Sequence, residues 1–161
     1  MIAHLDLRYR KWDGPKLPWK EDFGKAGGQV YSLDGTEPQR SCNEVEVAKR
    51  LRCVRDHAFW ISCYSASQIP NLWRPWAKAP DEAPHWLLAL DRNIRRLVSN
   101  AKGGIPDVVA WNDDDSRESA LFVECKGTNE SFKEGQEDWV AAALACGLHR
   151  TQFAVAVRTF T

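Results

Sequence analysis

Hydrophobic and polar residues follow two different periods along the first half of the chain. Residues 41–56 carry apolar positions at spacings of three and four, which predicts an amphipathic helix. The predicted buried face of this helix consists of Glu44, Val47, Ala48, Leu51 and Val54. Residues 58–64 (AFWISCY) are β-branched and aromatic, which predicts a buried strand directly after the helix.

The second half of the chain shows the same two patterns with clearer boundaries. Residues 105–111 (IPDVVAW) and 120–126 (ALFVECK) predict two short strands, and the polar run between them predicts an exposed hairpin loop. Residues 132–147 predict a helix that ends at its last glycine. Residues 152–158 (QFAVAVR) predict a final strand, so the order is helix, strand, intervening segment, strand, strand, helix, strand.

Two regions do not fit this core. Residues 1–40 are rich in Gly, Pro and aromatic residues, which predicts an irregular arm. Residues 65–84 contain four prolines and predict a loop, and residues 85–101 return to helical periodicity before a pair of glycines. We therefore expect one domain over 1–161, with a core of 41–64 and 105–158, an insertion of 65–104 and an N-terminal arm of 1–40.

Composition narrows the class of protein without naming a partner. A chain of 161 residues fits one domain, and no apolar run approaches the roughly 20 residues of a membrane span. The first residues alternate polar and apolar side chains, unlike a secretory signal or a lipidation site, so we expect a soluble, cytoplasmic protein. Five cysteines without a CxxC pair and four scattered histidines argue against a zinc site. Because 22 basic residues balance 22 acidic ones, any nucleic-acid footprint must be local.

The two strands of the predicted hairpin carry acidic residues at a notable position. Side chains alternate along a strand, so Glu124 and Lys126 share one face and the cysteine between them points to the other. If the hairpin closes symmetrically with Trp111 opposite Ala120, Asp107 lies directly across from Glu124. Opposed side chains have Cβ atoms about 4.5–5.5 Å apart. A shift of the register by one residue would separate the two acids.

Two carboxylates at this distance require compensation. They repel each other and are costly to desolvate unless a proton or a cation lies between them, and Lys126 compensates only one charge. Val109 opposite Phe122 would form an apolar floor beneath the acids. Carboxylates without histidine or thiolate suit a hard cation, so we expect Mg²⁺, with Mn²⁺ as a substitute. A metal there would support phosphodiester hydrolysis, with Lys126 orienting or deprotonating the attacking water.

Three short motifs carry a family resemblance. G-I-P-D at 104–107, F-V-E-C-K-G at 122–127 and E-G-Q-x-x-W at 134–139 resemble the PD-(D/E)XK nuclease superfamily, specifically its VRR-NUC branch. The resemblance covers about residues 42–158 without the insertion. It implies an α/β fold with a restriction-endonuclease-like αβββαβ core, in which helices flank a mixed sheet. This is the order of elements that the hydrophobic pattern predicts.

The resemblance also implies roles for individual residues. Asp107 and Glu124 would bind the metal together with the backbone carbonyl of Cys125, and Lys126 would activate the water. Gln136 corresponds to a helix glutamine beside the metal and the substrate phosphate, although a surface polar residue is an alternative reading. Catalysis in the family often uses another acid from the first helix.

Glu44 is the better candidate for that acid, because it shares the face of Val47 and Leu51 whereas Glu46 points away. Its alternative role is that of a first-turn acid favoured by the helix dipole. The acidic run at 113–115 lacks the glycine and the distal glutamate of a calcium loop, so we interpret it as solvated turn residues.

Basic residues on the predicted helices and beside the third motif are candidates for nucleic-acid binding. They can follow the phosphates of a nucleic acid, although a solvated helix face is the alternative. The candidates are Lys49, Arg50, Arg52, Arg92, Arg95, Arg96 and Lys133.

These observations predict an Mg²⁺-dependent DNA endonuclease that acts on duplex or branched DNA. Its cleavage would be structure-selective, or its role would lie in repair, recombination, phage replication or defence. The alternatives are a non-catalytic nucleic-acid-binding module that retains the nuclease fold, and an enzyme that acts on RNA. By analogy with stand-alone members of the family we expect a homodimer, and we expect no membrane partner.

Overall fold

The computed structural model of the chain describes residues 3–11, 30–32, 39–40, 43–61, 72–73, 83–98, 104–114 and 116–160. Its eight strands form a sheet with the order β3-β2-β1-β8-β7-β6-β4-β5. The strands are β1 (Ala3–Lys11), β2 (Val30–Ser32), β3 (Gln39–Arg40), β4 (His57–Ile61), β5 (Leu72–Trp73), β6 (Val108–Trp111), β7 (Leu121–Gly127) and β8 (Phe153–Phe160). The helices are α1 (Asn43–Leu51), α2 (His85–Leu97) and α3 (Glu134–Ala145), with two short 3₁₀ turns, η1 (Arg117–Ser119) and η2 (Arg150–Gln152).

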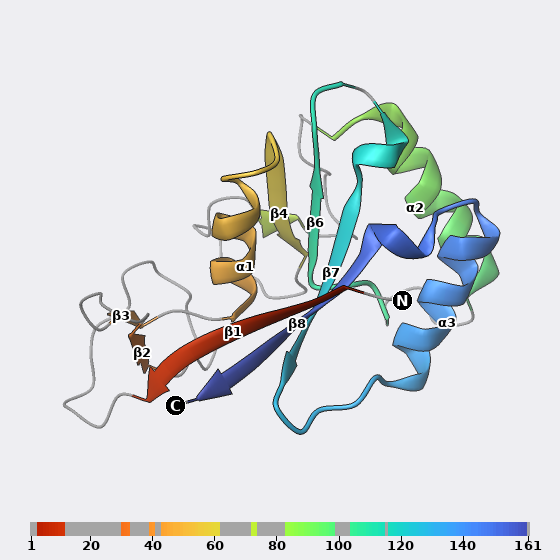
Figure 1. The fold of residues 1–161 in the computed structure, drawn as a ribbon. Helices are drawn as coiled ribbons and strands as arrows, with labels where there is room; N and C mark the ends of the chain where they lie inside the picture. Colours follow the sequence, from red (N-terminus) through yellow and green to blue (C-terminus); the bar gives the residue numbers. More distant parts are fainter. Residues whose placement is uncertain are drawn as a thin grey trace.

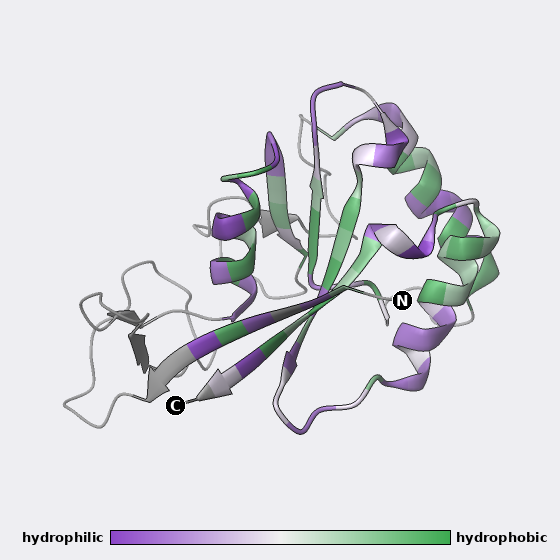
Figure 2. Cartoon of the chain, viewed as in Figure 1, coloured by the Kyte–Doolittle hydropathy of each residue, from purple (hydrophilic) through white to green (hydrophobic). Residues whose placement is uncertain are grey.

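The helices cover the two faces of the sheet unequally. Figure 1 shows α1 on one face and α2 and α3 on the other. Each face has its own apolar cluster: Leu51 of α1 packs with Val123, and Ile94 of α2 packs with Phe122 and Trp139. Hydrophobic residues follow the central strands and the inner sides of the helices (Figure 2). No helix in the described parts of the chain is long and apolar enough to cross a membrane.

The hairpin of β6 and β7 has the register that the symmetry of its loop predicts. The strands are antiparallel, with Val108 opposite Val123 and Val109 opposite Phe122. Because paired positions move in opposite directions along an antiparallel hairpin, the next pair is Asp107 with Glu124. The mixed α/β architecture and the order of core elements are confirmed as well, because β8 runs parallel to β7 while β4 runs antiparallel to β6.

The N-terminal segment differs from the prediction. The prediction of an irregular arm over 1–40 is wrong where β1 forms. This strand runs parallel to β8 over seven paired positions, from Ala3 opposite Ala154 to Tyr9 opposite Phe160. Leu7 is 3% exposed and belongs to the apolar cluster beneath α1. The alternation of polar and apolar residues at the N-terminus is therefore a strand pattern, which the Gly- and Pro-rich residues after it obscured. The short strands β2 and β3 extend the sheet beyond β1.

Two further boundaries differ from the expected ones. The first helix ends at Leu51, and Val54 is 64% exposed, so the predicted apolar face is wrong at its last position. The chain turns there to enter β4. Within the predicted loop of 65–84, β5 pairs in parallel with the end of β4. The second predicted helix ends at Leu97, and residues 99–103 lie outside the described part of the chain.

Candidate active site

A cleft of about 490 Å³ opens where β7 ends and β6 begins. It receives residues from α1, from the segment before β6, from β7, from the turn that follows β7, and from the first turn of α3. The lining residues are Glu44, Asp107, Glu124, Cys125, Lys126, Asn129, Glu130, Ser131, Lys133 and Gln136. The structure therefore brings together the five side chains that the sequence predicts to be catalytic, although they come from both faces of the sheet.

Asp107 lies in the bend directly before β6. Its backbone carbonyl accepts a hydrogen bond from the amide of Ile61 at 2.7 Å, which ties the bend to β4. Its Oδ2 accepts a hydrogen bond from the backbone amide of Cys125 at 2.8 Å, which ties the side chain to β7. Burial raises the pKa of the Asp107 carboxyl well above its usual value, and the charges of Glu124 and Glu44 raise it further. The amide of Cys125 lowers this pKa only in part.

Glu124 lies opposite Asp107 and is 5% exposed. Burial raises the pKa of its carboxyl, and the nearby ammonium of Lys126 works in the opposite direction. The two carboxyl groups therefore share a buried site in which the charged form of each is destabilised, and a bound cation would compensate these charges.

Lys126 and Gln136 hold one oxygen of Glu124. The Nζ of Lys126 lies 3.1 Å from Glu124 Oε1, and it donates a hydrogen bond to Gln136 Oε1 at 2.6 Å. The Nε2 of Gln136 donates a hydrogen bond to the same Glu124 oxygen. Gln136 Oε1 also accepts from the backbone amide of Lys133 at 2.9 Å. Because an ammonium and a backbone amide can only donate, this network fixes the orientation of the Gln136 amide and closes the start of α3.

The oxygen atoms in the cleft that remain available to a metal fit a hard cation. Glu124 Oε1 is engaged by Lys126 and Gln136, and Asp107 Oδ2 by a backbone amide, so each acid retains one oxygen for a metal. The side chain of Cys125 lies in the apolar cluster of α1, so only its carbonyl can turn toward the cleft. Within the described ranges no three Asp, Glu, His or Cys side chains form a ligand cluster. Two carboxylates supplemented by a carbonyl and waters suit Mg²⁺, which retains several waters when bound.

Glu44 approaches the pair from the other face of the sheet. It is half-buried in the first turn of α1, lines the cleft, and raises the pKa of both Asp107 and Glu124 through its charge. The side chain of Glu46 lies outside the cleft. The prediction that Glu46 points away from the covered face of the helix is nevertheless wrong, because Glu46 is buried whereas Glu44 is half-buried. The Oε1 of Glu46 lies 3.8 Å from the Nζ of Lys49.

Glycine 104 is a site component that the sequence motif alone does not explain. Its φ is +85°, and a Cβ built on Gly104 would lie 1.7 Å from the carbonyl oxygen of Gly135. Only glycine tolerates both this backbone conformation and this approach. The contact joins the segment before Asp107 to the first turn of α3, where Gln136 begins its bridge. The motifs G-I-P-D and E-G-Q therefore share one packing contact as well as one cleft.

The turn after β7 contributes residues that sequence reasoning missed. Asn129, Glu130 and Ser131 line the cleft. Glu130 Oε2 accepts a hydrogen bond from the amide of Gly127 at 3.0 Å, and the amide of Glu130 donates to the carbonyl of Gly127 at 3.1 Å. These bonds form a compact turn. The sequence signal is the run G-T-N-E-S, which predicts a turn but not the direction in which it faces.

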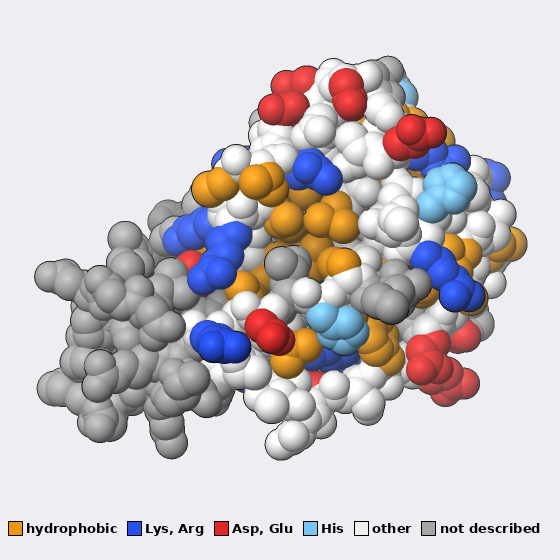
Figure 3. Space-filling view, viewed as in Figure 1, with side chains coloured by type: hydrophobic (Ala, Val, Ile, Leu, Met, Phe, Trp, Pro, Cys, Tyr) orange, Lys and Arg blue, Asp and Glu red, His pale blue; other side chains and the backbone are white. Residues whose placement is uncertain are grey.

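The candidate basic residues are distributed over several surfaces. Lys133 lines the cleft and is exposed. The other six do not line it, and those on α1 and α2 belong to opposite faces of the sheet. Lys49 and Arg50 are exposed on α1, and Arg92 and Arg96 are exposed on α2. On the face shown in Figure 3, Lys and Arg side chains form separate groups rather than one continuous patch.

Two of these arginines make contacts within the fold. Arg52 donates from Nε to the carbonyl of Ala58 at 3.2 Å, and its guanidinium lies 5.8 Å from the centre of the Phe59 ring. Arg95 donates from Nε to Asp91 at 2.8 Å on the same helix. These arginines are therefore less available for a phosphate than the exposed residues of the set.

The acidic run between β6 and β7 lies away from the cleft. Asp113 is exposed, and its Oδ1 accepts a hydrogen bond from Nε2 of His57 at 2.6 Å. Asp114 Oδ1 accepts from the amide of Ser116 at 3.0 Å, and residue 115 lies outside the described part of the chain. Asp114 therefore serves the local turn, whereas Asp113 joins the turn to the start of β4, and neither acid lines the cleft.

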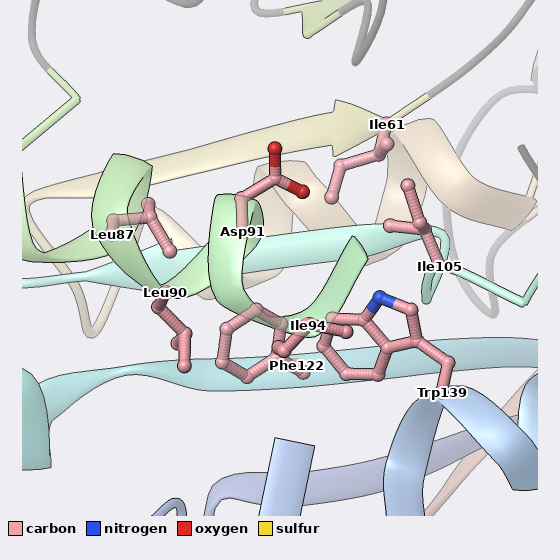
Figure 4. A pocket seen from close by; sticks show the side chains of 8 residues that line it. All are labelled: Ile61, Leu87, Leu90, Asp91, Ile94, Ile105, Phe122 and Trp139. Carbon is pink, nitrogen blue, oxygen red and sulfur yellow. The ribbon is translucent and has the colours of Figure 1, made fainter. Parts of the chain in front are cut away.

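A second, much smaller cavity lies between α2, β7 and α3 (Figure 4). It measures about 20 Å³ and is lined mainly by apolar side chains, among them Leu90, Ile94, Phe122 and Trp139. Its acidic residue, Asp91, is already paired with Arg95. A space of this size holds at most one water molecule, so the cavity is a packing gap in the core.

Comparison with known families agrees with this geometry. The VRR-NUC domain matches residues 67–156, more than half of the chain. The match includes α2, β6, β7 and α3, and therefore Asp107, Glu124, Lys126 and Gln136, whereas Glu44 precedes it. The matched residues also include most of 65–104, the segment predicted from the sequence to be an insertion. None of the curated proteins compared with the chain matches it in sequence. The chain belongs to the VRR-NUC domain family, within the PD-(D/E)XK nuclease-like superfamily.

Proposed function

We propose that the protein is a metal-dependent endonuclease that hydrolyses DNA phosphodiester bonds, with Mg²⁺ as its cofactor and Mn²⁺ as a substitute. Membership of the family indicates a nuclease function. The observation that carries the more specific proposal is the buried pair of Asp107 and Glu124, with the ammonium of Lys126 3.1 Å from Glu124, at an open cleft. A divalent cation would stabilise the charged forms of both carboxylates.

Each residue of the cleft has its own role in the proposed hydrolysis. Asp107 and Glu124 would hold the cation together with the backbone carbonyl of Cys125. When bound, a divalent cation would supply Lewis-acid chemistry, which polarises the phosphodiester and lowers the pKa of a nearby water. Lys126 positions this water or stabilises the charge on the phosphate, and Gln136 holds Lys126 in place. The exposed Lys133 pairs with a neighbouring phosphate at the mouth of the cleft.

The proposed substrate is duplex or branched DNA, cleaved structure-selectively in repair, recombination or defence. The separate basic groups on α1 and α2 would contact backbone phosphates beyond the cleft. One chain supplies one catalytic centre and duplex DNA has two strands, so a homodimer would cut both. This last step rests on analogy with the family.

The decisive experiment is a cleavage panel with single-stranded, duplex, flap and four-way-junction DNA and matching RNA, in Mg²⁺, Mn²⁺ or EDTA. We expect metal-dependent cleavage of DNA by the wild-type protein and a loss of at least about a thousandfold, or roughly 4 kcal/mol of transition-state stabilisation, in Glu124→Gln. Glu118→Gln is the matched control, because Glu118 is exposed in η1, outside the cleft, and undergoes the same change.

Three outcomes would contradict the proposal. Undiminished cleavage by folded Glu124→Gln would show that the acid pair is not the catalytic centre. Salt-sensitive DNA binding by the wild-type protein without cleavage in either metal would instead support a non-catalytic binding module. Preferential cleavage of the RNA panel would move the substrate class from DNA to RNA.

A further inference from the structure

The ammonium of Lys126 has a third neighbour besides Glu124 and Gln136. Its Nζ lies 5.3 Å from the centre of the Phe132 ring, on the face of that ring. The three neighbours come from β7, from α3 and from the turn between them. An ammonium has three N–H donors, and two of them are directed at carboxylate and amide oxygens. The ring therefore faces the remaining side of the ammonium.

The surroundings of Phe132 hold the ring in this position. Phe132 is half-buried and lines a cavity of about 20 Å³ together with Gly104, Val140 and Val155. The ring thus lies between an apolar gap under α3 and a lysine that is only 5% exposed. A cation is attracted to the face of an aromatic ring, and the attraction is larger where water is excluded. An aliphatic side chain would fill the space without this attraction.

We infer that Phe132 is a positioning residue of the active site, which keeps the Lys126 ammonium at the acid pair through its ring face. The inference rests on the proposed nuclease function. Lysine has a flexible four-carbon stem, so its charge has to be placed by its neighbours. Glu124 and Gln136 each engage the ammonium with an oxygen atom, and the face of the Phe132 ring adds a third contact. Phe132 acts through Lys126.

The test compares two substitutions at one position. Phe132→Leu keeps an apolar side chain and removes the ring, and Phe132→Tyr keeps the ring. We expect kcat to fall by about tenfold in the leucine variant, the size of a partly buried cation–π contact, and by less than about threefold in the tyrosine variant. The affinity for Mn²⁺, measured by calorimetry on the whole chain, stays unchanged in both, because the metal ligands are untouched.

Val140→Ala is the matched control. Val140 lines the same small cavity as Phe132, Glu124 and Gln136, and its substitution enlarges that cavity while leaving the three contacts of the Lys126 ammonium in place. We expect a lower melting temperature and an unchanged kcat. Should the leucine variant fail to fold, Phe132→Met offers the same comparison, and melting curves identify which variant is folded.

A second readout follows Lys126 itself. We expect the ring to shift the NMR signals of the Lys126 ε-methylene protons upfield in the wild-type protein, and this shift to persist in Phe132→Tyr and to disappear in Phe132→Leu. A cleaving wild-type protein with an equally fast leucine variant would overturn the role of Phe132 alone. The same holds if the tyrosine variant is as slow as the leucine variant. A wild-type protein that cleaves no nucleic acid would overturn the proposed function and, with it, this role.

Discussion

The same face of the same hairpin contains two regions with opposite energetics. At one end, Val109 opposes Phe122 beneath α2 and α3, and burial of these side chains stabilises the fold. At the other end, Asp107 opposes Glu124, and burial raises the pKa of both carboxyl groups because their charged forms lose water. The apolar end therefore holds the strands in register. At the acidic end the charged carboxylates are destabilised by burial, and a bound cation would compensate their charge.

This comparison teaches that the stability and the chemistry of the hairpin are separable. Substitutions at the apolar end lower the free energy of unfolding. Neutralising one acid of the pair should instead raise it. The following substitutions test that separation.

The largest effect is expected at the apolar end. Phe122 is buried, with its ring 5.3 Å from that of Trp139 and 6.0 Å from that of Phe153. Phe122→Ala should lower the free energy of unfolding by about 3–5 kcal/mol, because it removes buried apolar area and leaves a cavity. Urea denaturation measures this loss. A cost below about 1 kcal/mol would show that the apolar end does not hold the hairpin together.

An intermediate effect is expected where the two motifs meet. Gly104→Ala combines a left-handed backbone penalty of about 1–2 kcal/mol with an overpacking cost of about 1–3 kcal/mol against Gly135. Its displacement of Asp107 should also weaken Mn²⁺ binding. Gly147→Ala is the matched control: its φ is +88°, but the added Cβ meets only the flexible guanidinium of Arg117 at 3.5 Å. Equal costs in urea denaturation for the two variants would refute the contact.

The smallest effect has the opposite sign. Asp107→Asn removes one of two buried like charges, so it should raise the melting temperature of the metal-free protein at pH 7 by about 2–4 °C. Mg²⁺ should stabilise the wild-type protein and leave the variant unchanged. A variant that melts lower than the wild-type protein without metal would show that the acid pair is not strained.

The pH dependence of the metal-free protein follows from the same pair. Burial raises the folded-state pKa of both acids, so the folded state holds more protons than the unfolded state between the unfolded values, about 4, and the raised values. The stability contributed by these protons is complete below the unfolded pKa and is lost as pH rises through the folded pKa. Melting curves from pH 4 upward should show this loss in the wild-type protein, and a smaller loss in Asp107→Asn.

Local patterns in the sequence were sufficient for the hairpin and its acids. The loop between Trp111 and Ala120 is short and polar, so its symmetry fixes the register, and the register brings Asp107 to Glu124. The third helix and its glutamine follow from periodicity together with the family motif. The fold class is predicted correctly because each of these elements is specified by residues close together in the chain.

The features that sequence reasoning missed depend on contacts between distant parts of the chain. β1 is stabilised by β8, whose residues lie about 150 positions away, and its own alternation is too short to stand out beside a Gly- and Pro-rich region. The roles of Gly104 and Phe132 arise only after α3 has packed against the end of the sheet. The orientation of a flexible lysine leaves no periodic signal at all.

Gln136 gives the active site a direct link to local unfolding. Its Oε1 accepts both from the amide of Lys133, which closes the first turn of α3, and from the ammonium of Lys126. When this turn frays, Lys126 loses one of its three neighbours, so opening of the helix end also loosens the position of the ammonium. The local stability of a single helical turn therefore contributes to how firmly the charge is held beside Glu124.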